Sequence, residues 1–470
     1  MSDTIREGMH GCSREDTYVP PKDALVRERL EWFRDQKLAL MMHYGPYSQL
    51  GMDASWSLSD EDASWSRKNV DWESDSETYR RQYADAYKTF NPLRLQPDKW
   101  ADFAAENGFR YLIFTTKHHD GFCMWDTQYT DYKITAEECP FHTHRHADIV
   151  RAVFDAFRKR NIAIAAYFSK PDWHCPWYWA EGMDRPIAAD RYPTYEISEH
   201  PEIWERFTEF THNQIMELMT DYGRIDILWL DGGQVNPNIR GMDIRLSEVV
   251  AQARQLQPWL ITADRTVGGE NENYITPEQS IPDHPLRVPW ESCVTVGTQW
   301  GFRFGDTYKS ARTLVKMLIQ VVSHGGNLAL NVGPQPNGEL PPEALRELSG
   351  LGAWLKRNGE AIYGTRPCEA ARKGEAIYGT RPCEAARKGD FYFTQKGDTV
   401  YALLPMDADG ALTDTLRIPV AFPVRAVTLP DGGDVLPFEQ DDHGVLVSLP
   451  RTIHGQDTPA AVFALQIEKI

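Results

Sequence analysis

Three absences narrow the class of protein before any motif is considered. No apolar run approaches the ~20 residues that a membrane-spanning helix needs, and the N-terminal MSDTIREGMHGCSRED lacks the apolar stretch of a secretory signal. The seven cysteines include no Cys-x-x-Cys pair, which argues against a disulfide framework or a structural zinc site and fits a reduced cytoplasm. Positive charge is scarce: 50 Lys and Arg stand against 68 Asp and Glu, and a net charge of −18 repels phosphate backbones. We therefore expect a cytoplasmic protein with neither membrane nor nucleic acid as partner.

Length and aromatic content say more about what the chain is. At roughly 100–200 residues per domain, or up to about 250 for a barrel, 470 residues predict two domains. Tryptophan is abundant, with 15 residues beside 20 Tyr and 19 Phe. Such rings are either core residues or the walls of a pocket that stacks on sugar rings.

Short apolar runs alternate with amphipathic stretches over about the first 350 residues. The runs typical of strands covered on both faces lie at 38–43, 111–116, 162–168, 226–230, 259–262 and 327–332. Helical periodicity falls between them, at 147–160, 203–222, 243–255, 310–322 and 342–357. This alternation predicts an α/β fold with a parallel sheet.

The residues that end the predicted strands favour one form of α/β fold. Polar side chains that would be costly in a core follow several runs, at His43, 117–120, Asp231 and Asn331. In a (β/α)8 (TIM-like) barrel, the carboxyl ends of the strands form the active-site face. A doubly wound sheet is the alternative, but no Gly-x-Gly-x-x-Gly follows an early strand. We therefore predict a (β/α)8-type barrel.

The pattern changes near residue 390, where apolar and polar residues alternate between Gly, Pro and Asp turns. That pattern predicts a small C-terminal antiparallel β-sandwich. The expected organisation is a catalytic barrel at 1–358, a junction at 359–389 and the sandwich at 390–470.

The junction contains an exact tandem duplication. GEAIYGTRPCEAARK occurs at 359–373 and again, unchanged, at 374–388. Repeat folds tolerate drift and need at least three units, so two identical copies indicate a recent duplication or an assembly error.

Two carboxylates are candidates for chemistry. Asp231 ends DILWLDGG, which is either a common Asp-Gly turn or an active-face carboxylate with glycines that leave room for a substrate. Glu291 follows Trp290 in VPWESCVTV, so it is either a surface residue on a strand edge or a partly desolvated acid suited to proton donation. Together they match the nucleophile and acid/base of a glycosidase.

Two histidine-rich segments allow a metal interpretation. In KHHDGF, His118 and His119 reach one pocket only if the strand has already ended. No third ligand stands at standard spacing, so hydrogen bonds to hydroxyl groups are favoured. FHTHRHAD at 141–148 precedes a predicted helix, and we interpret it as a surface loop whose Asp148 serves the first helical turn. We expect no metal.

Seven blocks in one order resemble glycoside hydrolase family 29, the retaining α-L-fucosidases. They run from about Trp32 to Pro367 and read WFRDQKLALMMHYGPYS, YLIFTTKHHDGFCMWDT, IAAYFSKPDWH, DILWLDGG, DRTVGG, PWESCVTVGTQWGF and VVSHGGNLALNVGPQPNGELP. Any one block is weakly specific, but seven in order are highly specific. The resemblance implies a barrel with a C-terminal β-sandwich and a two-step retaining mechanism.

The resemblance also implies roles for single residues. Asp231 is the implied nucleophile and Glu291 the implied acid/base, with Glu278 of YITPEQ as the alternative. A cation at Arg265 would keep Asp231 ionised. The implied substrate-binding residues are His43, Trp56, His118, His119, Tyr167, Trp229, Arg265, Trp300 and Phe302. Among them, the walls formed by Trp229, Trp300 and Phe302 would accept the methyl group of a 6-deoxy sugar.

The sequence departs from the family pattern at two places. Where the family often has Glu-Trp-Tyr, this chain has MDASW, and Asp53, Ser55 and Trp56 match it only loosely. Phe168 stands where a tyrosine is common. These departures concern sugar specificity more than catalysis.

The function expected is that of an exo-acting α-L-fucosidase without a cofactor, acting on small fucosylated oligosaccharides or glycosides. A homo-oligomer is left open. One alternative is a glycosidase for another galacto-configured sugar, which would need a polar group where fucose has its methyl. The other is a non-catalytic sugar-binding protein, against which the two carboxylates argue.

Overall fold

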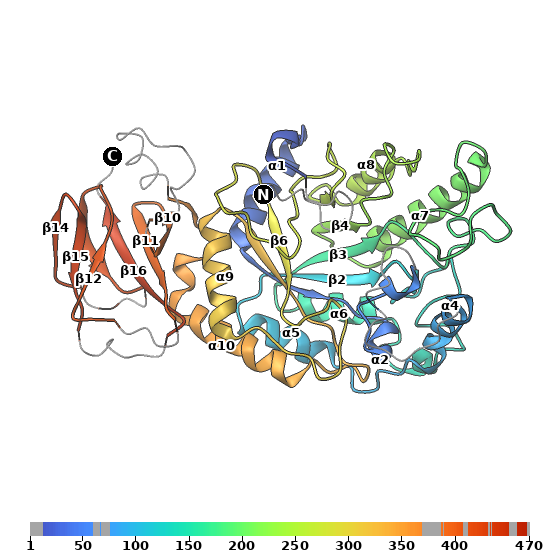
Figure 1. Cartoon of the computed structure of the whole chain (residues 1–470), viewed down its shortest axis with the longest axis horizontal. Helices are drawn as coiled ribbons and strands as arrows, with labels where there is room; N and C mark the ends of the chain where they lie inside the picture. The colour runs from blue at the N-terminus through green and yellow to red at the C-terminus, as the bar shows by residue number, and fades with distance from the viewer. Residues whose placement is uncertain are drawn as a thin grey trace.

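The computed structural model describes residues 13–59, 66, 76–368, 387–388, 390–407, 412–430, 433, 435–450 and 458–467. Figure 1 shows a larger unit of strands and helices beside a smaller unit made of strands at the C-terminal end of the chain.

The larger unit is built on a seven-stranded parallel sheet in the order β5-β4-β3-β2-β1-β7-β6. Its strands are β1 (Leu38–Met42), β2 (Tyr111–Lys117), β3 (Ala163–Ser169), β4 (Ile227–Asp231), β5 (Ile261–Asp264), β6 (Glu291–Thr295) and β7 (Asn327–Asn331). Nearly every residue in them is buried, because helices cover the outer face and the sheet curls around its own inner face.

An extended segment occupies the position between the two edge strands. Ile275 forms an isolated parallel bridge to Trp290, just before β6, and Glu278 forms one to Cys293 of β6, while Glu272 forms an antiparallel bridge to Ala263 of β5. This segment therefore lies where the eighth strand of a barrel would be, and the predicted TIM-like architecture is confirmed.

The inner face of the curled sheet carries a stack of side chains. One buried cluster includes residues from every strand, among them Ala39, Tyr111, Tyr167, Trp229, Ala263, Cys293 and Ala329. Because successive residues of a strand point to opposite faces, Trp229 and Asp231 project from β4 to the same side. Asp231 is one layer nearer the carboxyl end.

Helices surround the sheet (Figure 1). The longer ones are α1 (Ala24–Gln36), α5 (Pro97–Glu106), α6 (Ile149–Arg158), α7 (Pro201–Asp221), α8 (Leu246–Leu256), α9 (Ala311–Ser323) and α10 (Pro342–Asn358). As predicted, Asp148 serves the first turn of α6: its carboxylate accepts a hydrogen bond from the Arg151 amide at 3.0 Å.

The C-terminal unit consists of two antiparallel sheets around a second apolar cluster. One sheet contains β8 (Arg366–Pro367), β9 (Arg387–Lys388), β10 (Phe391–Lys396), β11 (Thr399–Pro405), β13 (Val424–Thr428) and β16 (Ala460–Ile467). The other contains β12 (Thr415–Ile418), β14 (Phe438–Asp441) and β15 (Gly444–Ser448). The predicted antiparallel architecture is confirmed.

Helices α9 and α10 connect the two units (Figure 1). The Trp354 indole of α10 donates to the Ala460 carbonyl at 3.0 Å, and Arg312 of α9 donates to the Met406 and Thr458 carbonyls at 2.8 Å each. Tyr392 and Tyr401 of the first sheet belong to the same apolar cluster as the barrel helices. The sandwich therefore packs against the barrel through α9 and α10.

The observed strands and helices lie close to the ranges predicted from the sequence. Each predicted apolar run overlaps a strand of the sheet, and each predicted helical range overlaps a helix, with bounds that differ by up to three residues. No apolar run predicts β6 or the segment beside it, because Glu291 and Pro277 interrupt their short apolar patterns. The domain bounds stay a prediction, and most of the junction, 369–386, lies outside the described residues. None of the helices in the described part of the chain is long and apolar enough to cross a membrane.

Candidate active site

Polar side chains converge at the carboxyl ends of the parallel strands. His43 follows β1, His118 and His119 follow β2, Asp231 ends β4 and Arg265 follows β5. All of these residues are at most slightly exposed. The residues predicted from strand ends therefore lie together, on the face where barrel enzymes have their active sites.

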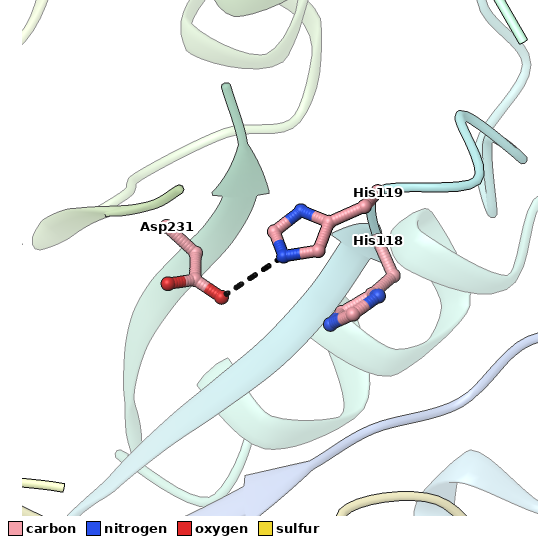
Figure 2. A group of neighbouring side chains, drawn as sticks. All are labelled: His118, His119 and Asp231. Atoms are coloured by element: carbon pink, nitrogen blue, oxygen red, sulfur yellow. Dashed lines mark ion pairs between the residues drawn. The ribbon is translucent and has the colours of Figure 1, made fainter. Parts of the chain in front are cut away.

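Asp231 is held by two donors and faces a histidine. Its Oδ1 accepts a hydrogen bond from Arg265 Nη1 at 2.6 Å, and its Oδ2 accepts one from the Tyr167 hydroxyl at 2.5 Å. His119 Nε2 lies 3.9 Å from Oδ2, and Figure 2 shows its ring directed at the carboxylate. The Asp231 side chain keeps 17% of its surface exposed, so a substrate can reach it.

The charge of Asp231 is stabilised by these neighbours. Burial alone would raise its pKa, but the Arg265 guanidinium, together with His119 and the Tyr167 hydroxyl, outweighs burial and holds the pKa well below its usual range. The carboxylate is therefore ionised at neutral and mildly acidic pH, as a nucleophile requires.

The three pocket histidines are held through Nδ1. His43 Nδ1 bonds to Asn331 Oδ1 at 2.7 Å, His118 Nδ1 to the Ser55 hydroxyl at 2.6 Å, and His119 Nδ1 to the Ser169 hydroxyl. Burial lowers the pKa of His43 and of His119 to about 4, and that of His118 well below its usual value. All three rings are neutral at neutral pH, which leaves each Nε2 available for a sugar hydroxyl.

Aromatic rings line the pocket in an arc. The ring centroids of neighbours in the arc lie 5.1 Å apart for Trp300 and His43, 5.4 Å for His43 and His118, 4.3 Å for His118 and His119, and 5.0 Å for His119 and Trp56. The structure thus brings Trp56 and Trp300 to opposite ends of the histidine row. Phe302, on the same loop as Trp300, is 8% exposed and packs edge-on against Phe304.

Trp229 forms the layer below Asp231. Its indole stacks on the Tyr167 ring with centroids 5.1 Å apart and planes inclined by 22°, and the Arg265 guanidinium lies 4.5 Å from the indole centroid. Tyr167 and Arg265 are also the two donors to Asp231. The predicted residues Tyr167, Trp229 and Arg265 therefore form one unit with Asp231, the predicted nucleophile.

The structure does not bring Glu291 to the pocket. It is the first residue of β6, at the opposite end of the strand from the polar face, and its exposed fraction is 0%. Its carboxyl oxygens accept hydrogen bonds from Trp229 Nε1 at 2.9 Å and from the Tyr111 hydroxyl. An acid/base must reach the glycosidic oxygen, so this position argues against the acid/base role assigned to Glu291 from the sequence.

Glu278 is the glutamate that shares the pocket with Asp231. Its Oε2 accepts a hydrogen bond from Arg265 Nη2 at 2.6 Å, while Nη1 of the same guanidinium binds Asp231. The Glu278 side chain is 15% exposed. It stands near the carboxyl end of the eighth-strand segment, beside Cys293 of β6. The alternative acid/base candidate therefore fulfils the geometric requirement that Glu291 fails.

Residues not singled out from the sequence also shape the site. Lys170 Nζ bonds to Asp264 Oδ1 at 2.5 Å and to the Val235 carbonyl at 2.9 Å, and the Lys170 amide donates to the Asp231 carbonyl. Lys170 thereby ties together the ends of β3, β4 and β5. Its place two residues after an apolar run, in IAAYFSKPDWH, is the signal that could have identified it.

The loosely matched segment MDASW is part of the site. Ser55 holds His118, as described above. Asp53 points elsewhere: its Oδ1 accepts a hydrogen bond from the Trp300 amide at 2.7 Å, and burial raises its pKa to about 6. Asp53 therefore anchors the loop that carries Trp300, and its bonded carboxylate faces the backbone of that loop.

His118, His119 and Asp231 have ligand atoms that all lie within 4.8 Å of one another, a spacing that could hold a metal ion. However, Nδ1 of each histidine already bonds to a serine, and Arg265 is paired with Asp231. A metal cation would face that guanidinium at close range. The donor set therefore fits the hydroxyl groups of a sugar better than it fits a cation.

Comparisons with known proteins agree with this geometry. The sequence model of the family described as Alpha-L-fucosidase matches residues 9–360. The chain is 26% identical to an alpha-L-fucosidase of Branchiostoma floridae over 423 residues (88% of this chain, 87% of that protein) and 28% identical to the plasma alpha-L-fucosidase of Rattus norvegicus over 360 residues (74% of each).

Solved structures show the same fold. Alpha-L-fucosidase isoenzyme 1 from Paenibacillus thiaminolyticus superposes with a TM-score of 0.74 at 27% identity, covering 95% of this chain and 100% of that one. The Thermotoga maritima alpha-fucosidase in complex with fucose superposes with a TM-score of 0.72 at 25% identity, covering 95% and 100%. This chain therefore belongs to the alpha-L-fucosidase family.

Proposed function

We propose that this protein is an exo-acting α-L-fucosidase that hydrolyses terminal α-L-fucosyl linkages of small glycans or glycosides with retention of configuration. The observation that carries the proposal is the Arg265 guanidinium, which binds the partly buried carboxylate Asp231 and the second pocket carboxylate Glu278 at the same time. A retaining glycosidase needs two carboxyl groups about 5–5.5 Å apart, and a single guanidinium that binds both keeps this pair close together. The names of the relatives support fucose as the sugar.

The two carboxylates divide the reaction between them. Asp231 attacks the anomeric carbon while Glu278 gives its proton to the departing glycosidic oxygen, which leaves a fucosyl ester on Asp231 and an ionised Glu278. Glu278 then takes a proton from water while the water oxygen attacks the anomeric carbon, which breaks the bond from that carbon to Asp231, releases fucose and regenerates both groups. Arg265 stays bound to both carboxylates and stabilises whichever of them is ionised.

The remaining side chains recognise the sugar. The neutral histidines present Nε2 atoms to hydroxyl groups, and the indole of Trp300 offers an apolar surface for the methyl group of a 6-deoxy sugar. The donors and rings surround Asp231 from several strand ends. This arrangement suits one terminal sugar unit, so release of single residues is proposed.

A panel of 4-nitrophenyl glycosides tests the proposal. The wild type should release nitrophenol from the α-L-fucoside far faster than from the galactosides and other hexosides. Asp231→Gly should release none, although its melting temperature should equal that of the wild type. Faster cleavage of another galacto-configured glycoside would show that its sugar, and not fucose, is the preferred substrate. Binding of fucose without any turnover would favour a non-catalytic sugar-binding protein. The cytoplasmic location stays a prediction, and the oligomeric state stays open.

A further inference from the structure

Glu291 is a fully buried carboxyl group beneath the pocket, and the proposed reaction does not use it. Both of its oxygens accept hydrogen bonds, from the Trp229 indole and the Tyr111 hydroxyl. Burial raises its pKa to about 7. Because an ionisable group in an apolar interior costs free energy that an apolar side chain would not, packing alone does not account for a glutamate here.

The Trp229 indole connects Glu291 to the catalytic layer. In the sheet, β4 lies between β3 and β5, so Tyr167 of β3 and Arg265 after β5 flank Trp229 on its two sides. The Tyr167 ring stacks on the indole, and the Arg265 guanidinium lies 4.5 Å from its centroid. Any rotation of the indole would therefore displace the two groups that hold the Asp231 carboxylate.

We propose that Glu291 is a positioning residue: its hydrogen bond to Trp229 Nε1 fixes the indole, and the indole fixes Tyr167 and Arg265 around the nucleophile Asp231. This inference rests on the proposed function. An indole has no second donor, so a single strong acceptor at Nε1 is enough to select one orientation of the ring. Glu291 provides that acceptor and at the same time bonds to Tyr111.

Substitutions at Glu291 separate positioning from chemistry. In Glu291→Gln, the amide oxygen still accepts from Trp229 and the amide nitrogen can donate to the Tyr111 oxygen. This variant should keep kcat/KM within a few-fold of wild type. Glu291→Leu offers no acceptor, and it should lower kcat/KM per active site by roughly tenfold to a hundredfold, the usual cost of a misplaced reacting group.

The same hydrogen bond can be removed from its other end. Trp229→Phe keeps an aromatic ring but has no N–H, so it should lower kcat/KM by a factor similar to that of Glu291→Leu. The double variant should lose little more than either single variant, because both remove one shared interaction. Tyr111→Phe is the matched control: it removes the other donor to Glu291 and should lower the melting temperature without lowering kcat/KM.

The leaving group identifies the step that is affected. Measurements should compare α-L-fucosyl fluoride, whose departure needs little protonation, with 4-nitrophenyl α-L-fucoside. A positioning residue lowers kcat/KM on both substrates by the same factor, since the attack by Asp231 is slowed in each. An acid/base lowers it mainly on the substrate with the poorer leaving group, and azide restores the rate.

The outcomes are distinct. Unchanged kcat/KM per active site in both Glu291→Leu and Trp229→Phe would reduce Glu291 to a folding role. A large loss in Glu291→Gln that depends on the leaving group or is rescued by azide would make it an acid/base. If Glu291→Leu does not fold, Trp229→Phe and Glu291→Gln still decide the question. A wild type inert on every fucoside would remove the proposed function, and this inference with it.

Discussion

The guanidinium of Arg265 and the carboxylate of Asp231 form a hydrogen-bonded ion pair with 2.6 Å between Nη1 and Oδ1. Arg265 is almost completely buried, and Asp231 is the more exposed partner. Arg265 therefore lies in the protein interior behind Asp231, and Asp231 faces the pocket. That arrangement keeps Asp231 ionised while leaving one side of its carboxylate free to react.

Removing this cation should change how activity depends on pH. Since the pKa of Asp231 lies below its usual range because Arg265 outweighs burial, Arg265→Met should raise that pKa. A raised pKa leaves Asp231 protonated at mildly acidic pH, so the acidic limb of the kcat/KM profile should move to higher pH. Arg265→Lys keeps the charge and should move it less. A limb that stays in place in Arg265→Met would show that the ion pair does not set the charge of Asp231.

Glu278 should behave as the proton donor. Glu278→Gln should lower kcat/KM on 4-nitrophenyl α-L-fucoside by about 10²–10⁴-fold, the usual contribution of general acid–base catalysis, and much less on α-L-fucosyl fluoride. Sodium azide should restore turnover and yield a fucosyl azide. Glu272→Gln is a suitable control, because Glu272 binds Ser13 and the Gly268 amide rather than Arg265. Equal losses on the two substrates would remove Glu278 from the acid/base role.

Much of this site could be predicted from the sequence, for one physical reason. Parallel strands that are buried on both faces give continuous apolar runs, so the polar residues that follow each run mark the active-site edge. His43, His118 and Asp231 are identified in this way. The antiparallel C-terminal unit is equally clear, since its period of two differs from the pattern before it.

The choice between two glutamates could not be made in the same way. Glu291 begins a short strand and Glu278 lies near the end of an irregular one, and neither boundary is marked by a long apolar run. The neighbouring Trp290 correctly indicates that Glu291 is desolvated. However, Glu291 is completely buried, so no substrate reaches its carboxyl group. Likewise, the Lys170–Asp264 bond depends on which strands are neighbours in the sheet, which local sequence does not encode.

The buried Glu291 should also leave a signature in stability. Its carboxyl has a pKa of about 7 in the folded protein, against 4.5 for an ordinary glutamate. The folded state thus holds this proton more tightly, and the resulting stabilisation is complete below about pH 4.5 and is lost as pH rises through 7. Glutamine does not ionise, so the melting temperature of Glu291→Gln relative to wild type should rise between pH 5 and pH 8.

The full effect corresponds to at most about 3 kcal/mol. Calorimetry of both proteins at the two pH values measures it. A difference in melting temperature that is the same at pH 5 and pH 8 would mean that Glu291 does not titrate in this range.

Deleting one copy of the duplicated segment should be harmless. The copies are identical, so removing 359–373 or 374–388 yields the same chain. One copy suffices for the contacts at the junction, where Tyr363 donates to the Gly108 carbonyl at 2.5 Å and Arg366 pairs with Asp35 and Glu31. Because a shorter loop costs less entropy to close, the melting temperature should stay the same or rise. A marked fall would show that both copies are needed for stability.

The most direct test of the whole account is to trap the fucosyl-enzyme. Incubation with 2-deoxy-2-fluoro-L-fucosyl fluoride should slow hydrolysis of the intermediate and leave one fluorofucosyl group covalently bound per chain. Peptide mapping by mass spectrometry should place that group on Asp231, and Asp231→Gly should acquire none. Label on another residue would refute the assignment of the nucleophile. Rapid turnover of fucosides with inverted configuration and no labelled enzyme would refute the retaining mechanism itself.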